Sequence, residues 1–145
     1  MNSSSASNPP DDVAGILATC RTVAVVGLSP KPGRDSFRVS RYMQAHGWRV
    51  IPVNPLAAAS GLPILGEMVY ASLTEAARAE SIDLVNVFRN SDDVPPLVDE
   101  AIALRLPAVW LQLGISSDTA MDRAKATGML TVQNRCLMVE HARFA

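Results

Sequence analysis

The sequence has only two cysteines, few aromatic residues and no excess of charge of either sign. Cys20 and Cys136 are too few for a disulfide framework and indicate a reduced, cytoplasmic setting. The 13 Lys and Arg residues nearly balance the 14 Asp and Glu residues, which argues against a nucleic-acid-binding or polybasic membrane-binding surface. The longest apolar run, Val23 to Leu28, is far shorter than the ~20 residues that span a bilayer.

Apolar residues are nevertheless abundant. They make up 48% of the 145 residues, against 19% charged residues, so the chain is able to bury a core and is not wholly disordered. The length is close to the roughly 150 residues of one domain. Residues 1–10 are small and polar, unlike a secretory signal, and we expect a disordered N-terminal arm there. Residues 11–145 are expected to form a single domain.

Apolar, β-branched runs alternate with helical patterns along the rest of the chain. The run Val23–Leu28 carries no charge on either face, which is typical of a central strand covered on both sides. The alternation predicts an α/β, Rossmann-like, doubly wound fold with five parallel strands in the order 3-2-1-4-5 and helices on both faces. We expect strands at residues 23–28, 48–53, 82–88, 107–112 and 129–133, helices at residues 11–20, 36–46, 70–78, 92–106, 116–127 and 137–143, and a loop after residue 55 that runs to about residue 67.

The turn after the first strand carries the clearest chemical signal. In such a sheet, ligands bind beyond the carboxyl ends of the strands. Gly27 permits a tight turn, Lys31 and Arg34 supply positive charge, and Ser36 could cap a helix whose start attracts phosphate. The alternative is an ordinary strand–helix turn with solvated basic groups.

Two familiar phosphate-binding motifs do not match this turn. In the dinucleotide fingerprint G-x-G-x-x-G, Ser29 stands at the second glycine and Pro32 at the third. The acid that would hold the ribose of NAD is missing after the second strand, where the sequence is Val53-Asn54-Pro55. The P-loop motif fails because Gly27 and Gly33 are one residue too far apart.

Five motifs in order, each at a strand end, resemble the small bacterial CoA-binding protein family, whose members are single-domain and Rossmann-like. That family is in turn similar to the CoA-binding domain of the succinyl-CoA synthetase alpha chain. The match covers roughly residues 21–144. The motifs are G-x-S-x-K-P-x-R-x-S, V-x-P-V-N-P, N-V-F-R, W-L-Q-L-G and N-R-C-x-x-x-E-H.

The resemblance implies that coenzyme A is the ligand and assigns regions of the chain to its parts. The first loop would hold the phosphates through Gly27, Ser29, Pro30, Lys31 and Pro32, with Arg34 and Ser36 at the following helix start. Adenine and ribose would border Val53, Asn54 and Pro55. The pantetheine arm would pass Leu111, Gln112, Leu113 and Gly114, with Phe88 and Arg89 between the two regions.

One departure from the related synthetase domain concerns the 3′-phosphate. There a basic residue follows the proline of the second strand's loop, whereas here Pro55 is followed by the uncharged stretch Leu56–Ala59. The partner of the 3′-phosphate must come from elsewhere, and Lys31, Arg34 and Arg49 are the candidates.

The cysteines and histidines give weaker signals. Cys136 either packs as a small apolar residue or meets a thiol cofactor, and Arg135 stands beside it in the sequence. Cys20 is expected in the core, and His46 and His141 are expected to be structural. No catalytic residue is assigned, and no metal site is expected.

These observations favour a binding protein for CoA or an acyl-CoA, without catalysis of its own. The alternative is an NAD- or CoA-linked enzyme or redox protein that uses Cys136 or a partner subunit. A third possibility is a scaffold whose ligand site has degenerated. We expect no nucleic-acid or membrane partner, and a homodimer or a partner enzyme is compatible with the sequence.

Overall fold

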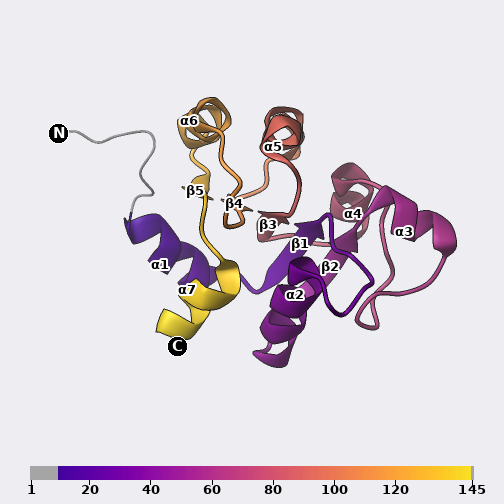
Figure 1. Ribbon diagram of the computed structural model, residues 1–145. Helices are drawn as coiled ribbons and strands as arrows, with labels where there is room; N and C mark the ends of the chain where they lie inside the picture. The colour runs from indigo at the N-terminus through magenta and orange to yellow at the C-terminus, as the bar shows by residue number, and fades with distance from the viewer. Residues whose placement is uncertain (1–9, 145) are drawn as a thin grey trace.

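The computed structural model describes residues 10–144, so residues 1–9 of the arm expected at residues 1–10 lie outside the described residues. Pro10, assigned to that arm, begins the first helix. Figure 1 shows the elements in chain order: α1 (Pro10–Thr19), β1 (Thr22–Val26), α2 (Asp35–Ala45), β2 (Arg49–Val53), α3 (Pro55–Ser60), α4 (Leu73–Ala79), β3 (Leu84–Val87), the 3₁₀ turn η1 (Ser91–Asp93), α5 (Val94–Ala103), β4 (Ala108–Leu111), α6 (Asp118–Ala126), β5 (Leu130–Val132) and α7 (Leu137–Phe144).

The five strands form one parallel sheet, which confirms the predicted fold class. Val26 pairs with Val53 of β2 and with Val87 of β3, so these three strands end at the same level. We call this border of the sheet the carboxyl edge. The loops that leave it connect β1 to α2, β2 to α3, β3 to α5, β4 to α6 and β5 to α7.

The predicted strand order 3-2-1-4-5 is wrong, because the sheet has the order β2-β1-β3-β4-β5. The place outside β2, where a further strand was expected, holds only a bridge between Tyr70 and Val53. The segment that reaches it contains Gly61, Pro63 and Gly66, which do not favour a strand. The chain then crosses back through α4, and β3 pairs with the other side of β1.

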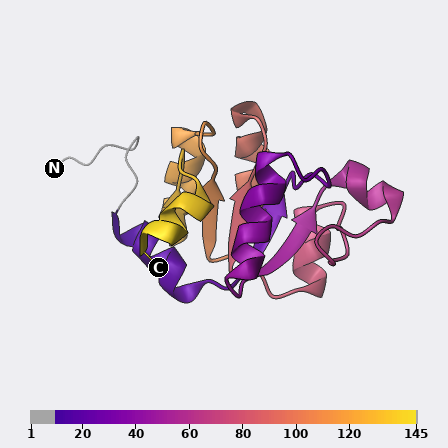
Figure 2. The same ribbon diagram turned by 60° about the horizontal axis from the view of Figure 1, so that its bottom comes forward.

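Helices cover both faces of the sheet, as Figure 1 and Figure 2 show. On one face, α4, α5 and α6 pack against alternate strand residues such as Val26, Val87 and Leu111. On the other face, α1, α2 and α7 pack against Val25 and Trp110 and their neighbours. The period of two along each strand therefore divides the apolar residues between two cores, and this explains why the strands are apolar throughout.

The loop expected after residue 55 contains the helix α3, so that expectation is wrong for residues 55–60. Asn54 caps the helix by accepting hydrogen bonds from Leu56 and Ala57, and Pro55 occupies its first position. These are ordinary helix-start signals. In both ribbon views, α3 projects beyond the β2 border of the sheet.

The remaining helices agree closely with the predicted ranges. Pro95 and Pro96 lie in the first turn of α5, where a missing N–H is tolerated. Across residues 10–144, none of the helices combines the length and the apolar character that crossing a membrane requires.

Candidate functional site

The loop between β1 and α2 is held in shape by its own two serines. The backbone N–H of Ser29 donates to Ser36 Oγ at 3.0 Å, and the N–H of Lys31 donates to Ser29 Oγ at 3.1 Å. The sequence suggested that Ser36 could cap α2, but its hydroxyl oxygen accepts the hydrogen bond from Ser29 and makes no cap. The N-cap residue is Arg34, and its side chain makes no capping hydrogen bond.

This arrangement leaves the start of α2 without a side-chain cap. Unpaired first-turn N–H groups and the helix dipole attract anions. Lys31 and Arg34 are exposed beside it, and within residues 10–144 neither side chain makes an ion pair. Backbone donors and two unpaired cations thus lie together on one loop, which is the chemistry of a phosphate site.

Gly27 brings the end of β1 against the end of β3. Its φ is +90°, and a Cβ at this position would lie 2.3 Å from the carbonyl oxygen of Phe88 and 3.1 Å from Cδ of Arg89. Only glycine allows this approach. The structure therefore places Gly27, Phe88 and Arg89, all predicted site residues, in direct contact.

A hollow of about 400 Å³ opens beside this contact at the carboxyl edge. Its lining joins the loop after β3 to the loop after β4, and it contains Phe88, Arg89, Asn90, Ser91, Gly114 and Ile115. Sequence analysis missed Asn90, Ser91 and Ile115. The signal was present, because each of them follows within four residues of a strand end on that edge.

A second cluster of hydrogen bonds joins the loops after β4 and β5. The N–H of Gly114 donates to Asn134 Oδ1 at 2.7 Å, and the N–H of Asn134 donates to the carbonyl of Ile115 at 3.1 Å. Arg135 follows, exposed and, within the described residues, without an ion pair. Arg135 is a further candidate cation at the carboxyl edge that was not assigned to the site.

The residues expected around adenine differ in how they face solvent. Val53 is buried in the core, whereas Pro55 is exposed. The side chain of Asn54 is occupied, since its Oδ1 caps α3 and its Nδ2 donates to the carbonyl of Leu28 at 3.0 Å. Asn54 therefore positions two loops.

The predicted pantetheine path is similarly mixed. Leu111 is fully buried, while Leu113 is 69% exposed. Gln112 is buried, and its Oε1 accepts a hydrogen bond of 2.9 Å from the N–H of Leu137 at the start of α7. In this group, Leu113 and Gly114 are the exposed members, and Leu111 and Gln112 support the loop from below.

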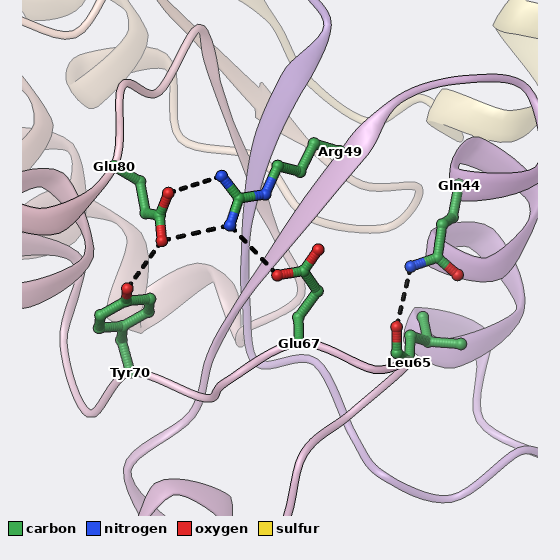
Figure 3. A network of polar contacts seen from close by, with 6 residues as sticks. All are labelled: Gln44, Arg49, Leu65, Glu67, Tyr70 and Glu80. Atoms are coloured by element: carbon green, nitrogen blue, oxygen red, sulfur yellow. Dashed lines mark hydrogen bonds and ion pairs between the residues drawn. The ribbon is translucent and has the colours of Figure 1, made fainter.

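Arg49, one candidate for the 3′-phosphate, lies at the opposite end of the sheet. It is the first residue of β2, and its guanidinium donates to Glu80 at 2.7 Å and to Glu67 at 3.3 Å. Tyr70 donates to the same Glu80 carboxylate at 2.8 Å, which raises the pKa of Tyr70 (Figure 3). Arg49 thus ties the segment outside β2 to the sheet and does not face the carboxyl edge.

The histidines form a separate cluster between α2 and α7. Tyr42 and His141 share a hydrogen bond of 3.0 Å, and the His46 ring stacks on Tyr42. Burial, followed by the nearby charges of His46 and Arg21, lowers the pKa of His141. The lowered pKa favours the neutral ring, and the packing of His141 is in keeping with the expected structural role.

The cysteines are both free. Burial raises the pKa of the Cys20 thiol, which keeps it protonated in the core. Cys136 is half-buried immediately before α7. Within residues 10–144, no three His, Cys, Asp or Glu side chains gather as a metal site would require.

A parallel sheet covered by helices on both faces, with a glycine turn and a basic loop at its carboxyl edge, defines the Rossmann-like α/β class of proteins. Residues 21–142 match the family described as the CoA binding domain. The chain belongs to this family, and the resemblance found in the sequence is confirmed.

Individual proteins are similar to this chain over most of their length. Uncharacterized protein YneT of Bacillus subtilis (strain 168) is 36% identical over 131 residues, which cover 90% of this chain and 93% of YneT. The structure of cell-free ID.343 from Thermus thermophilus has a TM-score of 0.85 at 36% identity, covering 93% of this chain and 98% of that one. Prb, a redesigned form of the PH1109 protein, has a TM-score of 0.85 at 34% identity, covering 94% and 92%.

Proposed function

We propose that this protein binds coenzyme A, or an acyl-CoA, at the carboxyl edge of its sheet and has no catalytic residues of its own. The observation that carries the proposal is the loop from Gly27 to Arg34. It combines an uncapped helix start with two unpaired cations, and membership of the CoA binding domain family supports the same ligand.

The proposal assigns the diphosphate to this loop and to the start of α2. Ser29 and Ser36 act by shaping the loop, while Lys31 and Arg34 supply charge. Adenine would lie against Pro55. The pantetheine arm would cross the hollow beside Phe88 and leave over Leu113 and Gly114.

Differential thermal stabilisation tests this function. The protein is heated separately with CoA, dephospho-CoA, NAD and ATP, each at several concentrations. A ligand at a hundredfold excess over its dissociation constant stabilises the folded state by about 2.7 kcal/mol. CoA should give the largest shift, and a shift no greater than that of the other three nucleotides would reject the proposal.

A second candidate function uses the half-buried thiol of Cys136. It precedes the first turn of α7, and Arg135 adds positive charge beside it. In a CoA-linked redox protein, the Cys136 thiolate would attack a disulfide of CoA, forming a mixed disulfide with one CoA and releasing the other as a thiol. Intact-mass measurement of protein purified without reductant decides between the two functions. A CoA adduct that is absent from the Cys136→Ser variant supports the redox function, whereas an unmodified thiol supports simple binding.

Two further expectations remain part of the proposal. The free thiols of Cys20 and Cys136 favour a reduced, cytoplasmic setting. Residues 11–145 are proposed to act as one CoA-binding domain. A homodimer or a partner enzyme would be detected by light scattering and by co-purification.

A further inference from the structure

Arg89 lies at the carboxyl edge with a hollow on each side. One hollow, of about 400 Å³, includes Phe88 and Gly114, and the other, of about 280 Å³, includes Val26 and Leu97. The aliphatic stem of Arg89 lies beside Gly27, on which a Cβ would be 3.1 Å from Cδ. The stem of Arg89 therefore lies against Gly27, the first residue of the loop proposed to hold phosphate.

Within the described residues, the guanidinium has one ion-pair partner, the carboxylate of Asp93. Nη2 of Arg89 lies 3.3 Å from Asp93 Oδ2, and the side chains are 43% and 45% exposed. An exposed ion pair at this distance contributes little to stability. A phosphate dianion would replace the carboxylate at little cost in free energy, since arginine binds phosphate through strong, charge-assisted hydrogen bonds.

The position of Asp93 explains why its carboxylate is available. Asp93 is the N-cap residue of α5, where an aspartate ordinarily accepts hydrogen bonds from the second or third helical N–H. Those positions are Pro95 and Pro96, which have no N–H to donate. The carboxylate makes no capping hydrogen bond and instead faces Arg89.

We propose that Arg89 binds a phosphate group of the ligand and that Asp93 is the internal anion that this phosphate displaces. The inference rests on the proposed function and deepens it, because it assigns a phosphate-recognising role to the cation between the two hollows. Asp93 then lowers ligand affinity by occupying Arg89 in the free protein. Its removal should tighten binding.

A double-mutant cycle measured by calorimetry tests the inference. We expect Arg89→Gln to weaken CoA binding about tenfold or more and Asp93→Asn to tighten it about threefold to tenfold. In the Arg89→Gln background, Asp93→Asn should have little effect. Equal tightening in both backgrounds would show that Asp93 acts through its general charge, and this result would overturn the inference.

Asp92→Asn is the matched control. Asp92 is the adjacent carboxylate, is exposed, and within residues 10–144 makes no ion pair. Its substitution changes the net charge equally and should leave the affinity nearly unchanged. Tightening as large as that of Asp93→Asn would also count against the inference.

Two further probes identify the phosphate and separate the inference from the proposed function. If Arg89 binds the 3′-phosphate, Arg89→Gln affects CoA much more than dephospho-CoA; similar losses indicate the diphosphate. Inorganic pyrophosphate tests the cation without the rest of the ligand. If the protein does not bind CoA but binds pyrophosphate in a way that depends on Arg89, the proposed function is rejected and the inference is retained. If Arg89→Gln binds both CoA and pyrophosphate as tightly as the wild type, the inference alone is rejected.

Discussion

The Asn54 side chain donates a hydrogen bond of 3.0 Å to the backbone carbonyl of Leu28. This contact joins the loop after β2 to the loop after β1, and these are the two loops proposed to hold the nucleotide. The same side chain accepts hydrogen bonds from the first turn of α3. One residue therefore fixes both the relative position of the loops and the start of a helix.

Two substitutions separate these roles of Asn54. Asn54→Asp retains the cap but loses the donor to Leu28, whereas Asn54→Ala loses both. We expect Asn54→Ala to cost about 1–2 kcal/mol of unfolding free energy, and Asn54→Asp to cost less. Denaturant unfolding measures both values. Equal stability of the alanine variant and the wild type would contradict the proposed cap.

Gly27 and Gly47 make a matched pair for testing the close approach of β1 and β3. Their φ values are +90° and +88°, but a Cβ on Gly47 would meet nothing within 4 Å. Gly47→Ala should cost about 1–2 kcal/mol from backbone strain alone. Gly27→Ala adds the clash with Phe88 and should cost clearly more. Similar losses in thermal unfolding would show that Phe88 moves aside easily.

Lys31→Ala and Arg34→Ala test the phosphate loop. Each should weaken CoA binding by about 1–3 kcal/mol, because a charge-assisted hydrogen bond to phosphate is lost. Fold stability should hardly change, since both side chains are exposed. Arg78→Ala, in the last turn of α4, removes a positive charge outside the phosphate loop and is the control for general charge. Unaltered CoA affinity in both loop variants would move the phosphate site elsewhere.

His141 predicts how stability depends on pH. Its pKa is lowered in the folded protein, so the unfolded chain takes up a proton first, at the ordinary value of about 6.5. Stability therefore falls as the pH drops through that value. We expect the Tm to decrease between about pH 7.5 and about pH 5.5, and to decrease less in His141→Gln.

The comparison variant for this measurement is His46→Gln. Repulsion from His46 is a smaller cause of the shift than burial, so this variant should retain most of the pH dependence. A His141→Gln profile identical to that of the wild type would assign the acid sensitivity to other groups.

Arg49 should contribute to stability more than an ordinary surface arginine. Its removal leaves Glu80, whose side chain is 17% exposed, without its cation beside Tyr70 (Figure 3). We expect Arg49→Met to lower the unfolding free energy by about 1 kcal/mol. Arg38→Met removes only an exposed helical pair with Asp35 and should cost less than about 0.5 kcal/mol. Equal losses would show that the network adds nothing.

The sequence by itself determined the fold class, because apolar runs of strand length alternating with helical patterns allow few architectures other than a covered parallel sheet. It also located the loop from Gly27 to Ser36, since glycine permits a tight turn at a strand end and serine and basic residues are typical of loops that bind anions. The helix α3 could also have been predicted from the sequence, because Asn54 and Pro55 are standard helix-start signals.

Only the tertiary structure decided the strand order, because strand pairing depends on the side of β1 to which the chain returns. The single bridge at Tyr70 has almost no recognisable pattern in the local sequence. It also decided the partners of each polar side chain. Arg49 lies far from the carboxyl edge, and Ser36 accepts a hydrogen bond from the loop instead of capping α2. Such contacts join residues distant in the chain, and their choice depends on packing that no local sequence pattern records.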